Sequence, residues 1–146
     1  MRFQFHLCPE AVERGIEFKA PRVGDAGFDL PALETCELPG KALTLVRTGV
    51  HVAIPEGWVG LIRDRSSLAM RGLATVAGVI DASYRGEVKV AIQNLSETPI
   101  RFTPGDRIAQ LVVVPHLIVE QFTPVSDLKD LGSTARGVAG FGSTGS

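Results

Sequence analysis

The chain has 146 residues, of which 45% are hydrophobic and 21% are charged, and its 15 basic and 16 acidic side chains leave a formal net charge of −1. A chain of this length can bury one sizeable core, so we expect one main domain. The near-zero net charge argues against a protein that attracts nucleic acid or an anionic membrane through its overall field. Any anion must therefore be bound by a local group of residues.

The first fifteen residues, MRFQFHLCPEAVERG, interrupt their apolar positions with charges and a proline. They do not resemble a secretory signal, and no apolar run approaches the roughly 18 residues that a membrane span needs. We therefore expect a cytoplasmic protein. In a reducing compartment, Cys8 and Cys36 are expected to be free thiols.

Period-two alternation predicts β-strands along most of the chain. Apolar β-branched residues occupy every second position in 50–54 and again in 88–92. Further strands are expected at 2–7, 43–48, 58–63, 99–103 and 108–114, which are closed off by Gly, Pro or Asp. Short strands at this spacing predict an all-β fold, a jelly roll or β-sandwich.

Helix signals are scarce. One short helix is predicted in SSLAMRGL (66–73), where a serine can cap the first turn and Gly72 can end the helix. From Gly132 onward, five of fifteen residues are glycine, and the only large side chains are Arg136 and Phe141. We therefore predict a β domain over 1–131 and a flexible C-terminal arm over 132–146.

The segment GDAGFDL (24–30) places Asp25 and Asp29 four residues apart. Two carboxylates near a loop could hold a hydrated Mg²⁺, because this ion keeps most of its waters and accepts few protein ligands. Two turn aspartates that bond to local backbone explain the same residues, and the segment alone favours that second interpretation.

The segment DRSSLAMRGL (64–73) combines Arg65 with Ser66 and Ser67 at the predicted start of the helix. Free backbone N–H groups beside hydroxyls, together with the planar donor fork of an arginine, make a phosphate site. An ordinary helix start beside a solvated arginine fits these residues equally well.

Two further segments carry side chains that could take part in catalysis or ligand binding. GVIDASYRGEVKV (78–90) has Asp81 after an apolar pair, followed by the only tyrosine, Tyr84. A carboxylate at a strand end can act as a general base and an aromatic ring can stack on a sugar, although a turn aspartate and a core tyrosine are the simpler interpretations. In GDRIAQLVVV (105–114), Gln110 lies on a mostly apolar face, and its amide needs a partner in a ligand or, more simply, in the protein.

In order and spacing, these segments resemble the five motifs of the homotrimeric dUTPases, deoxyuridine triphosphate nucleotidohydrolases. The matching stretches are DAGFDLPA, RSSLAMRGL, GVIDASYRGEV, GDRIAQLVV and RGVAGFGSTG. The resemblance implies a jelly-roll subunit in a threefold homotrimer with shared active sites. One subunit would supply the first, second and fourth motifs, a neighbour the third, and the remaining chain its C-terminal arm.

The resemblance also implies Mg²⁺-dependent hydrolysis of dUTP to dUMP and pyrophosphate, which keeps uracil out of DNA and supplies dUMP. By matched position, Asp81 would be the general base and Asp29 would anchor a water on the magnesium ion. The substrate contacts implied on the folded part of the chain are Arg65, Ser66 and Gln110 at the phosphates, Tyr84 at the deoxyribose and Thr75 near uracil, with Ser67 and Gly78 as further substrate-binding residues. The contacts implied on the arm are Arg136 at the γ-phosphate, Phe141 over uracil, and Ser143 and Thr144 closing on the phosphates, with Gly142 as a further substrate-binding residue.

Some positions depart from the family pattern. Thr75 stands where many bacterial members have asparagine, Asp64 replaces a frequent proline, Ser83 replaces a frequent acidic residue, and Ala139 replaces a frequent glycine. None of these changes removes a group with an implied chemical role.

Two alternative functions are weighed against this one. The dCTP deaminases share the subunit fold and an RSSL-type segment, but they carry a glutamate where this chain has Ala91, and they lack the RGxxGFGSTG ending. A non-catalytic nucleotide-binding trimer is the second alternative. It is disfavoured because Asp81, Arg136 and Phe141 are all present.

Overall fold

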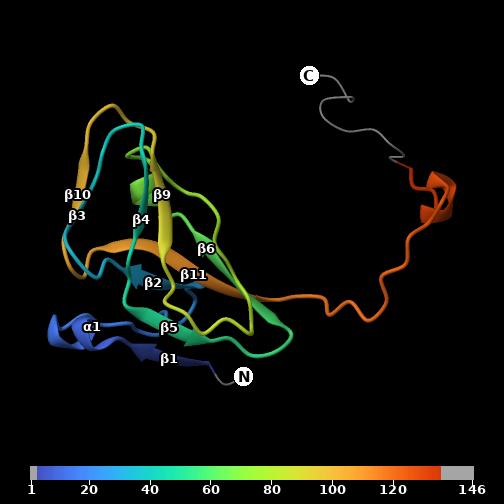
Figure 1. Cartoon of the computed structure of the whole chain (residues 1–146), viewed down its shortest axis with the longest axis horizontal. Helices are drawn as coiled ribbons and strands as arrows, with labels where there is room; N and C mark the ends of the chain where they lie inside the picture. Colours follow the sequence, from blue (N-terminus) through green and yellow to red (C-terminus); the bar gives the residue numbers. More distant parts are fainter. Residues whose placement is uncertain (1–2, 136–146) are drawn as a thin grey trace.

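The computed structural model describes residues 3–135 and consists mainly of short strands, as the sequence predicts (Figure 1). The strands are β1 (Gln4–Leu7), β2 (Gly27–Pro31), β3 (Cys36–Leu38), β4 (Leu43–Val46), β5 (Val50–Ala53), β6 (Trp58–Arg63), β7 (Leu73–Thr75), β8 (Val79–Ile80), β9 (Val90–Asn94), β10 (Ile100–Phe102) and β11 (Arg107–Pro115). The helical segments are α1 (Pro9–Glu13), α2 (Ser66–Ala69) and a 3-10 helix, η1 (Leu128–Leu131). Within residues 3–135, no helix is long and apolar enough to cross a membrane.

The largest sheet has the strand order β2-β11-β6-β8, and a second has the order β4-β9-β7. Two further pairs, β1-β5 and β10-β3, complete the described part of the fold, and every pairing is antiparallel. The nine-residue strand β11 pairs on both sides, with β2 and with β6. Because of this central position, a side chain on β11 has neighbours from two distant parts of the sequence.

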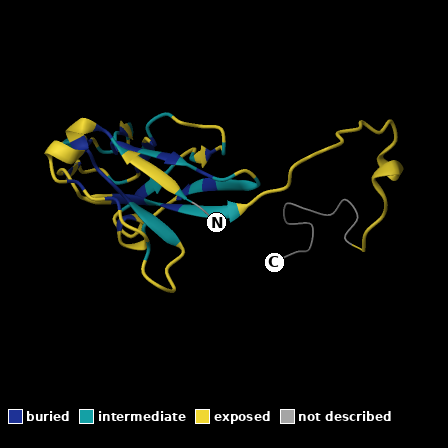
Figure 2. Cartoon of the chain, turned by 90° about the horizontal axis from the view of Figure 1, so that it is seen from below, coloured by how far each residue is buried: buried dark blue, intermediate teal, exposed yellow. Residues whose placement is uncertain are grey.

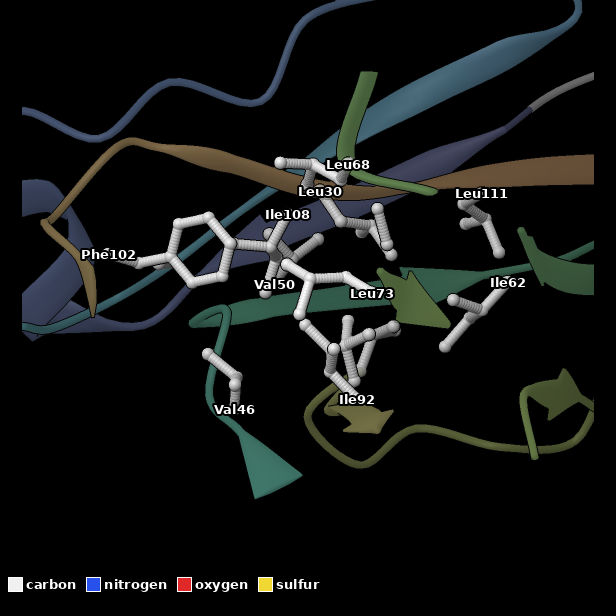
Figure 3. Close-up of a cluster of buried hydrophobic side chains, with 14 of the residues drawn as sticks. Leu30, Val46, Val50, Ile62, Leu68, Leu73, Ile92, Phe102, Ile108 and Leu111 are labelled. Carbon is white, nitrogen blue, oxygen red and sulfur yellow. The ribbon is translucent and has the colours of Figure 1, made fainter. Parts of the chain in front are cut away.

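The core is built from the alternating apolar positions of these strands. Figure 3 shows Leu30, Ile62, Ile92 and Leu111 gathered in one cluster, and all four are buried. Figure 2 shows the same pattern for residues 3–135, with buried residues inside the body and exposed residues on its rim. Truncating a fully buried leucine such as Leu111 would cost about 2–5 kcal/mol, because the cavity left behind adds to the lost burial.

The helices differ from the single helix predicted at 66–73. Helix α1 is additional; it has a proline in its first turn and buries Ala11 completely, but five residues are too few to produce a periodic pattern. Helix α2 ends at Ala69, and the residue before it, Arg65, caps it without a side-chain hydrogen bond. The expected serine cap is therefore wrong, because Ser66 is already the first helical residue.

Both cysteines, Cys8 and Cys36, are free thiols as predicted. Burial, reinforced by the nearby carboxylates of Glu34 and Asp106, raises the pKa of the Cys36 thiol. The thiolate, which is the reactive form, is therefore disfavoured at this position.

After β11 the chain runs away from the body, and residues 116–135 are exposed throughout (Figures 1 and 2). This segment exposes large apolar side chains, among them Leu117, Phe122 and Leu131. Such side chains leave apolar surface without cover from the rest of the described chain. The domain boundary at residue 131 stays a prediction.

Candidate functional site

Three of the predicted site residues meet at one end of the β2-β11-β6 sheet. The register of the sheet places Gln110 on β11 directly opposite Asp29 on β2 and opposite Arg63 on β6. Arg65 follows β6 by two residues and begins the turn into α2, so it reaches the same end of the sheet. We call Asp29, Asp64, Arg65, Arg107 and Gln110 the arginine–carboxylate cluster.

Asp29 is held between two guanidinium groups in this cluster. Its Oδ1 lies 3.0 Å from Nε of Arg65, and its Oδ2 lies 3.5 Å from Nη1 of Arg107. The Asp29 side chain is 44% exposed, so these ion pairs fix its orientation more than they stabilise the fold. The carboxylate keeps lone pairs that face solvent.

Arg65 is oriented by a second contact. Its Nη1 donates to the backbone carbonyl of Arg107 at 2.7 Å, while its Nε faces Asp29. A guanidinium has five N–H donors, and these two contacts use only two of them. The remaining donors are available to an anionic ligand, which is the chemistry predicted for Arg65.

Gln110 has a partner in the protein, as its sequence position suggests. Its Nε2 donates to the backbone carbonyl of Asp64 at 2.8 Å. The amide fits because Gly27 has no side chain: a Cβ added there would lie 2.5 Å from Oε1 of Gln110. The second N–H of this amide remains open to a ligand.

Ser66 and Ser67 form the first turn of α2, with exposed side chains. Among the residues that the structure describes, neither hydroxyl nor backbone N–H of this pair has a hydrogen-bond partner. Four donors at the end of β6 therefore lie beside Arg65. They can act as local phosphate contacts, although a four-residue helix contributes little macrodipole.

The segment from Thr75 to Gly78, which connects β7 in one sheet to β8 in the other, contacts β6 and the residue after it at the same end. The N–H of Thr75 donates to Oδ1 of Asp64 at 2.6 Å, and the carbonyl of Gly78 accepts from the N–H of Ile62 at 2.8 Å. Position 78 requires glycine, because its φ is +120° and an added Cβ would lie 2.7 Å from Cβ of Ile62. Ala77 beside it also has a positive φ, +65°, which is uncommon for a residue with a side chain.

Asp81 and Tyr84 lie outside the arginine–carboxylate cluster. The Asp81 carboxylate is exposed and has no hydrogen bond or ion pair with any residue in 3–135. Tyr84 is 42% exposed, so it is not a core residue, and its hydroxyl donates to the carbonyl of Glu87 at 2.9 Å. A carboxylate with free lone pairs and an exposed aromatic ring are the features expected of a base and a stacking surface.

The register shows how far apart these two groups lie in one chain. On β6, Arg63 is opposite Gln110, whereas Gly60 is opposite Ile80, the residue before Asp81. Strands rise ~3.3 Å per residue, so Asp81 lies about 13 Å along the sheet from the level of Gln110. A single described chain therefore does not bring the candidate base next to the candidate phosphate contacts.

Two residues of the cluster, Asp64 and Arg107, were not among the predicted site residues. Arg107 lies in the segment GDRIAQ, which also contains the predicted site residue Gln110, and a positive charge within that motif is the signal that could have identified it. Asp64 accepts from both Gln110 and Thr75, and no local pattern indicates contacts of that kind. The arm residues Arg136, Phe141, Gly142, Ser143 and Thr144 lie outside the described residues.

The described residues contain no group of three or more His, Cys, Asp or Glu side chains arranged to hold a metal ion. Asp25 and Asp29 line the same groove, and Asp29 also forms ion pairs with Arg65 and Arg107. A half-exposed single carboxylate suits contact with Mg²⁺ through a water, because this ion keeps most of its hydration shell. The residues therefore fit a magnesium ion that is coordinated mainly by phosphate oxygens and water, with few ligands from the protein.

Comparison with known proteins agrees with this chemistry. A family model described as dUTPase matches residues 15–145. The deoxyuridine 5'-triphosphate nucleotidohydrolase of Mycobacterium marinum is 52% identical over 127 residues, which cover 84% of this chain and 82% of that protein. The enzyme of the same name from Cutibacterium acnes is 46% identical over 142 residues, which cover 94% of this chain and 87% of that protein.

A solved structure gives the same result for the fold. The dUTPase of Staphylococcus bacteriophage 80alpha, solved with dUpNHpp, matches with a TM-score of 0.86 and 28% identity and covers 99% of both chains. Family model, sequence relatives and fold all agree, and this chain belongs to the dUTPase family.

Proposed function

We propose that this protein is an enzyme that hydrolyses dUTP to dUMP and pyrophosphate. The observation that carries the proposal is the arginine–carboxylate cluster, in which Arg65 and Gln110 keep free donors beside Asp29, within a chain of the dUTPase family. Donors of this kind bind phosphate oxygens, and an oriented guanidinium can donate two parallel N–H bonds to one phosphate group.

In the proposed site, the phosphate chain of the nucleotide lies against the unpaired donors of Arg65, Ser66, Ser67 and Gln110. The contacts of Arg65 with Asp29 and with the carbonyl of Arg107 hold the guanidinium before substrate arrives. Pre-oriented donors lower the entropy that must be lost in binding, and they stabilise charge that develops on the phosphates.

Asp81 is the proposed general base. One oxygen of its carboxylate takes a proton from a water molecule as the water oxygen bonds to the α-phosphorus. The bond from the α-phosphorus to the oxygen bridging to the β-phosphorus breaks, so dUMP and pyrophosphate leave. An exposed carboxylate without a partner in residues 3–135 is available for this role.

The sugar and the base are assigned to the third motif. The exposed ring of Tyr84 would pack against deoxyribose and exclude a ribose 2′-hydroxyl, and backbone groups of the β7–β8 connection around Thr75 and Gly78 would contact uracil. The left-handed conformation at Ala77 supports a functional role for this connection, because such strain is retained mainly at sites that use it.

Mg²⁺ is the proposed cofactor, with Asp29 as its one contact from the folded domain, through a water. When bound to the triphosphate, the ion would neutralise charge on the phosphate oxygens. The role of Arg65 and Arg107 in this arrangement is to orient the Asp29 carboxylate through their ion pairs with it.

The active form is proposed to be a homotrimer with shared sites. Two observations support it: Asp81 lies about 13 Å along the sheet from the level of Gln110, and residues 116–135 expose apolar side chains that the rest of the described chain does not cover. The arm residues Arg136, Phe141, Gly142, Ser143 and Thr144 are proposed to close the site from a third chain.

The reaction can be tested by incubating the purified protein and Mg²⁺ with dUTP, dCTP, dTTP and UTP separately. Pyrophosphate and ammonia are measured in each reaction. We expect rapid pyrophosphate release from dUTP and slow release from the other three nucleotides. Ammonia from dCTP would instead indicate a deaminase, the function that Ala91 argues against, and binding of dUTP without any product would indicate a non-catalytic trimer.

A further inference from the structure

Glu87 makes a dense set of contacts, although it has no role in the proposed chemistry. Its side chain is only 12% exposed. Oε1 accepts hydrogen bonds from the backbone N–H groups of Thr48, at 3.1 Å, and Gly49, at 2.9 Å. Oε2 lies 3.1 Å from Nε of Arg47. Three consecutive residues in the turn between β4 and β5 thus hold one carboxylate.

The backbone of Glu87, which its carboxylate fixes to the β4–β5 turn, is linked to Tyr84 and Asp81 by hydrogen bonds. The Tyr84 hydroxyl donates to the carbonyl of Glu87 at 2.9 Å, and the Tyr84 N–H donates to the carbonyl of Asp81 at 3.0 Å. A Cβ added at Gly86 would collide with the Tyr84 hydroxyl, so the ring lies directly over that residue. Glu87, Tyr84 and Asp81 are therefore linked by consecutive short-range contacts.

Further contacts fix the downstream side of this segment. The Val88 N–H donates to the carbonyl of Val50 at 2.7 Å, and the buried hydroxyl of Thr48 donates to the carbonyl of Val88 at 2.5 Å. Nδ1 of His51 lies 3.0 Å from the carbonyl of Arg85. The β4–β5 turn and the start of β5 therefore hold residues 85–88 as a unit, and the Glu87 carboxylate is the charged side chain that ties this unit to the turn. The Arg85 guanidinium bonds within the segment, to the carbonyls of Ala82 and Tyr84.

The charge of Glu87 is maintained by these contacts. Burial alone would raise the pKa of its carboxyl, but the N–H of Gly49 and the guanidinium of Arg47 outweigh burial, and the pKa is lowered. Arg47 also contacts Glu10 at 3.3 Å and is partly exposed, so its pair with Glu87 is partly screened. A glutamine at this position could still accept from the two N–H groups, but its NH₂ group would face the Arg47 donors.

We propose that Glu87 is a positioning residue for the third motif. It fixes the segment that carries Asp81 and Tyr84, and so determines both the rate of hydrolysis and the discrimination between dUTP and UTP. This inference rests on the proposed roles of Asp81 and Tyr84. It predicts that changes at Glu87 alter substrate preference, which a purely structural residue would leave unchanged.

The test compares Glu87→Ala and Glu87→Gln with a control, Glu97→Ala, which removes an exposed ion pair with Lys41 elsewhere on the surface. The kcat and KM values are measured for dUTP and UTP. Because Tyr84 is the only tyrosine, ¹³C-tyrosine NMR gives one ring signal that reports its position without any activity assay.

For Glu87→Ala we expect kcat with dUTP to fall by roughly 10–100-fold, the scale of a small misplacement of reacting groups. The ratio of kcat/KM for dUTP over UTP should fall by about fivefold or more, equivalent to one lost positioned contact. The Tyr84 signal should move. Glu87→Gln should show smaller changes in the same direction, and Glu97→Ala should match the unmodified protein.

The outcomes separate this inference from the proposed function. If the unmodified protein releases no pyrophosphate from dUTP, the proposed function fails, while the Tyr84 signal still tests the anchoring by Glu87. If the unmodified protein is active and folded Glu87→Gln and Glu87→Ala keep the nucleotide preference and the Tyr84 signal, the positioning role is overturned. Should Glu87→Ala fail to fold, Glu87→Gln decides alone, because it keeps the size and the acceptor oxygen.

Discussion

Replacing Gly27 with alanine tests whether the orientation of Gln110 matters for catalysis. Gly27 lies on β2, and a Cβ added there would lie 2.5 Å from Oε1 of Gln110 and 3.1 Å from its Cβ. Ordinary contact begins at about 3.5 Å, so the amide must move by about 1 Å. That shift stretches the 2.8 Å bond from Gln110 to the carbonyl of Asp64 beyond hydrogen-bond distance.

The fold should tolerate Gly27→Ala. The clash is with the end of a flexible side chain, and the φ of Gly27 lies outside the left-handed region, so alanine fits the backbone. Alanine is also less costly than glycine in a strand by roughly 0.5–1 kcal/mol, which offsets the displaced amide. We therefore expect the free energy of unfolding to change by less than about 1 kcal/mol.

Activity should respond much more strongly. The loss of one hydrogen bond corresponds to about a fivefold effect, and a misplacement of about 1 Å can cost about 100-fold, so kcat/KM for dUTP should fall within that range. The assay is pyrophosphate release by Gly27→Ala, by Gln110→Ala and by the double variant. The double variant should be no worse than Gln110→Ala alone, because both changes act through one side chain. Additive losses, or full activity of Gly27→Ala, would refute this reasoning.

Three further predictions concern the base, the arm and the anchored carboxylate. Asp81→Asn should keep dUTP binding but lower kcat by about 10²–10⁴-fold, measured by calorimetry and pyrophosphate release; normal turnover would mean that the base is another residue. Truncation after Leu131 should leave the circular dichroism spectrum unchanged and lower turnover by about 10³-fold, so a near-normal rate would show that the arm is dispensable. The pKa of Glu87 is lower in the folded than in the unfolded protein, so its ionised carboxylate stabilises the fold. This contribution to the free energy of unfolding is fully present above the unfolded-state pKa, about 4.3, and is lost as the pH falls through the folded-state pKa. The stability difference between unmodified protein and Glu87→Gln, measured by urea unfolding, should therefore shrink below pH 4; a difference that is constant with pH would contradict the assignment.

Strands with a clear alternating pattern were predictable from the sequence. β6 matches its predicted range of 58–63, and β11 extends its predicted range by one residue at each end. β7 and β8, with three and two residues, are too short for any period to appear. β2 contains Gly27 and Pro31, residue types that pattern analysis counts as strand breakers, and it forms because the edge of the sheet accepts them.

The site was predictable in residue types but not in contacts. Motif spacing identified Asp29, Arg65 and Gln110, and the structure brings these three together. Motif spacing could not indicate that Asp64 links Gln110 to Thr75. The bond between Gln110 and Asp64 joins residues 46 positions apart and depends on strand register, and the bond between Thr75 and Asp64 depends on how the chain turns back after α2. Nor could motif spacing indicate the distance from Asp81 to this cluster, which follows from the pairing of β6 with β8 on one side and β11 on the other.

In the proposed trimer, one active site takes its phosphate contacts and its base from different chains. The most direct test of this sharing uses two inactive variants, Arg65→Ala and Asp81→Asn. They are unfolded, mixed in equal amounts and refolded together, and pyrophosphate release from dUTP is then measured. In random trimers, about one quarter of the sites would combine an intact Arg65 with a neighbour's intact Asp81, so the mixture should recover about a quarter of the unmodified activity. A mixture that contains verified mixed trimers and yet stays as inactive as its parents would contradict the claim.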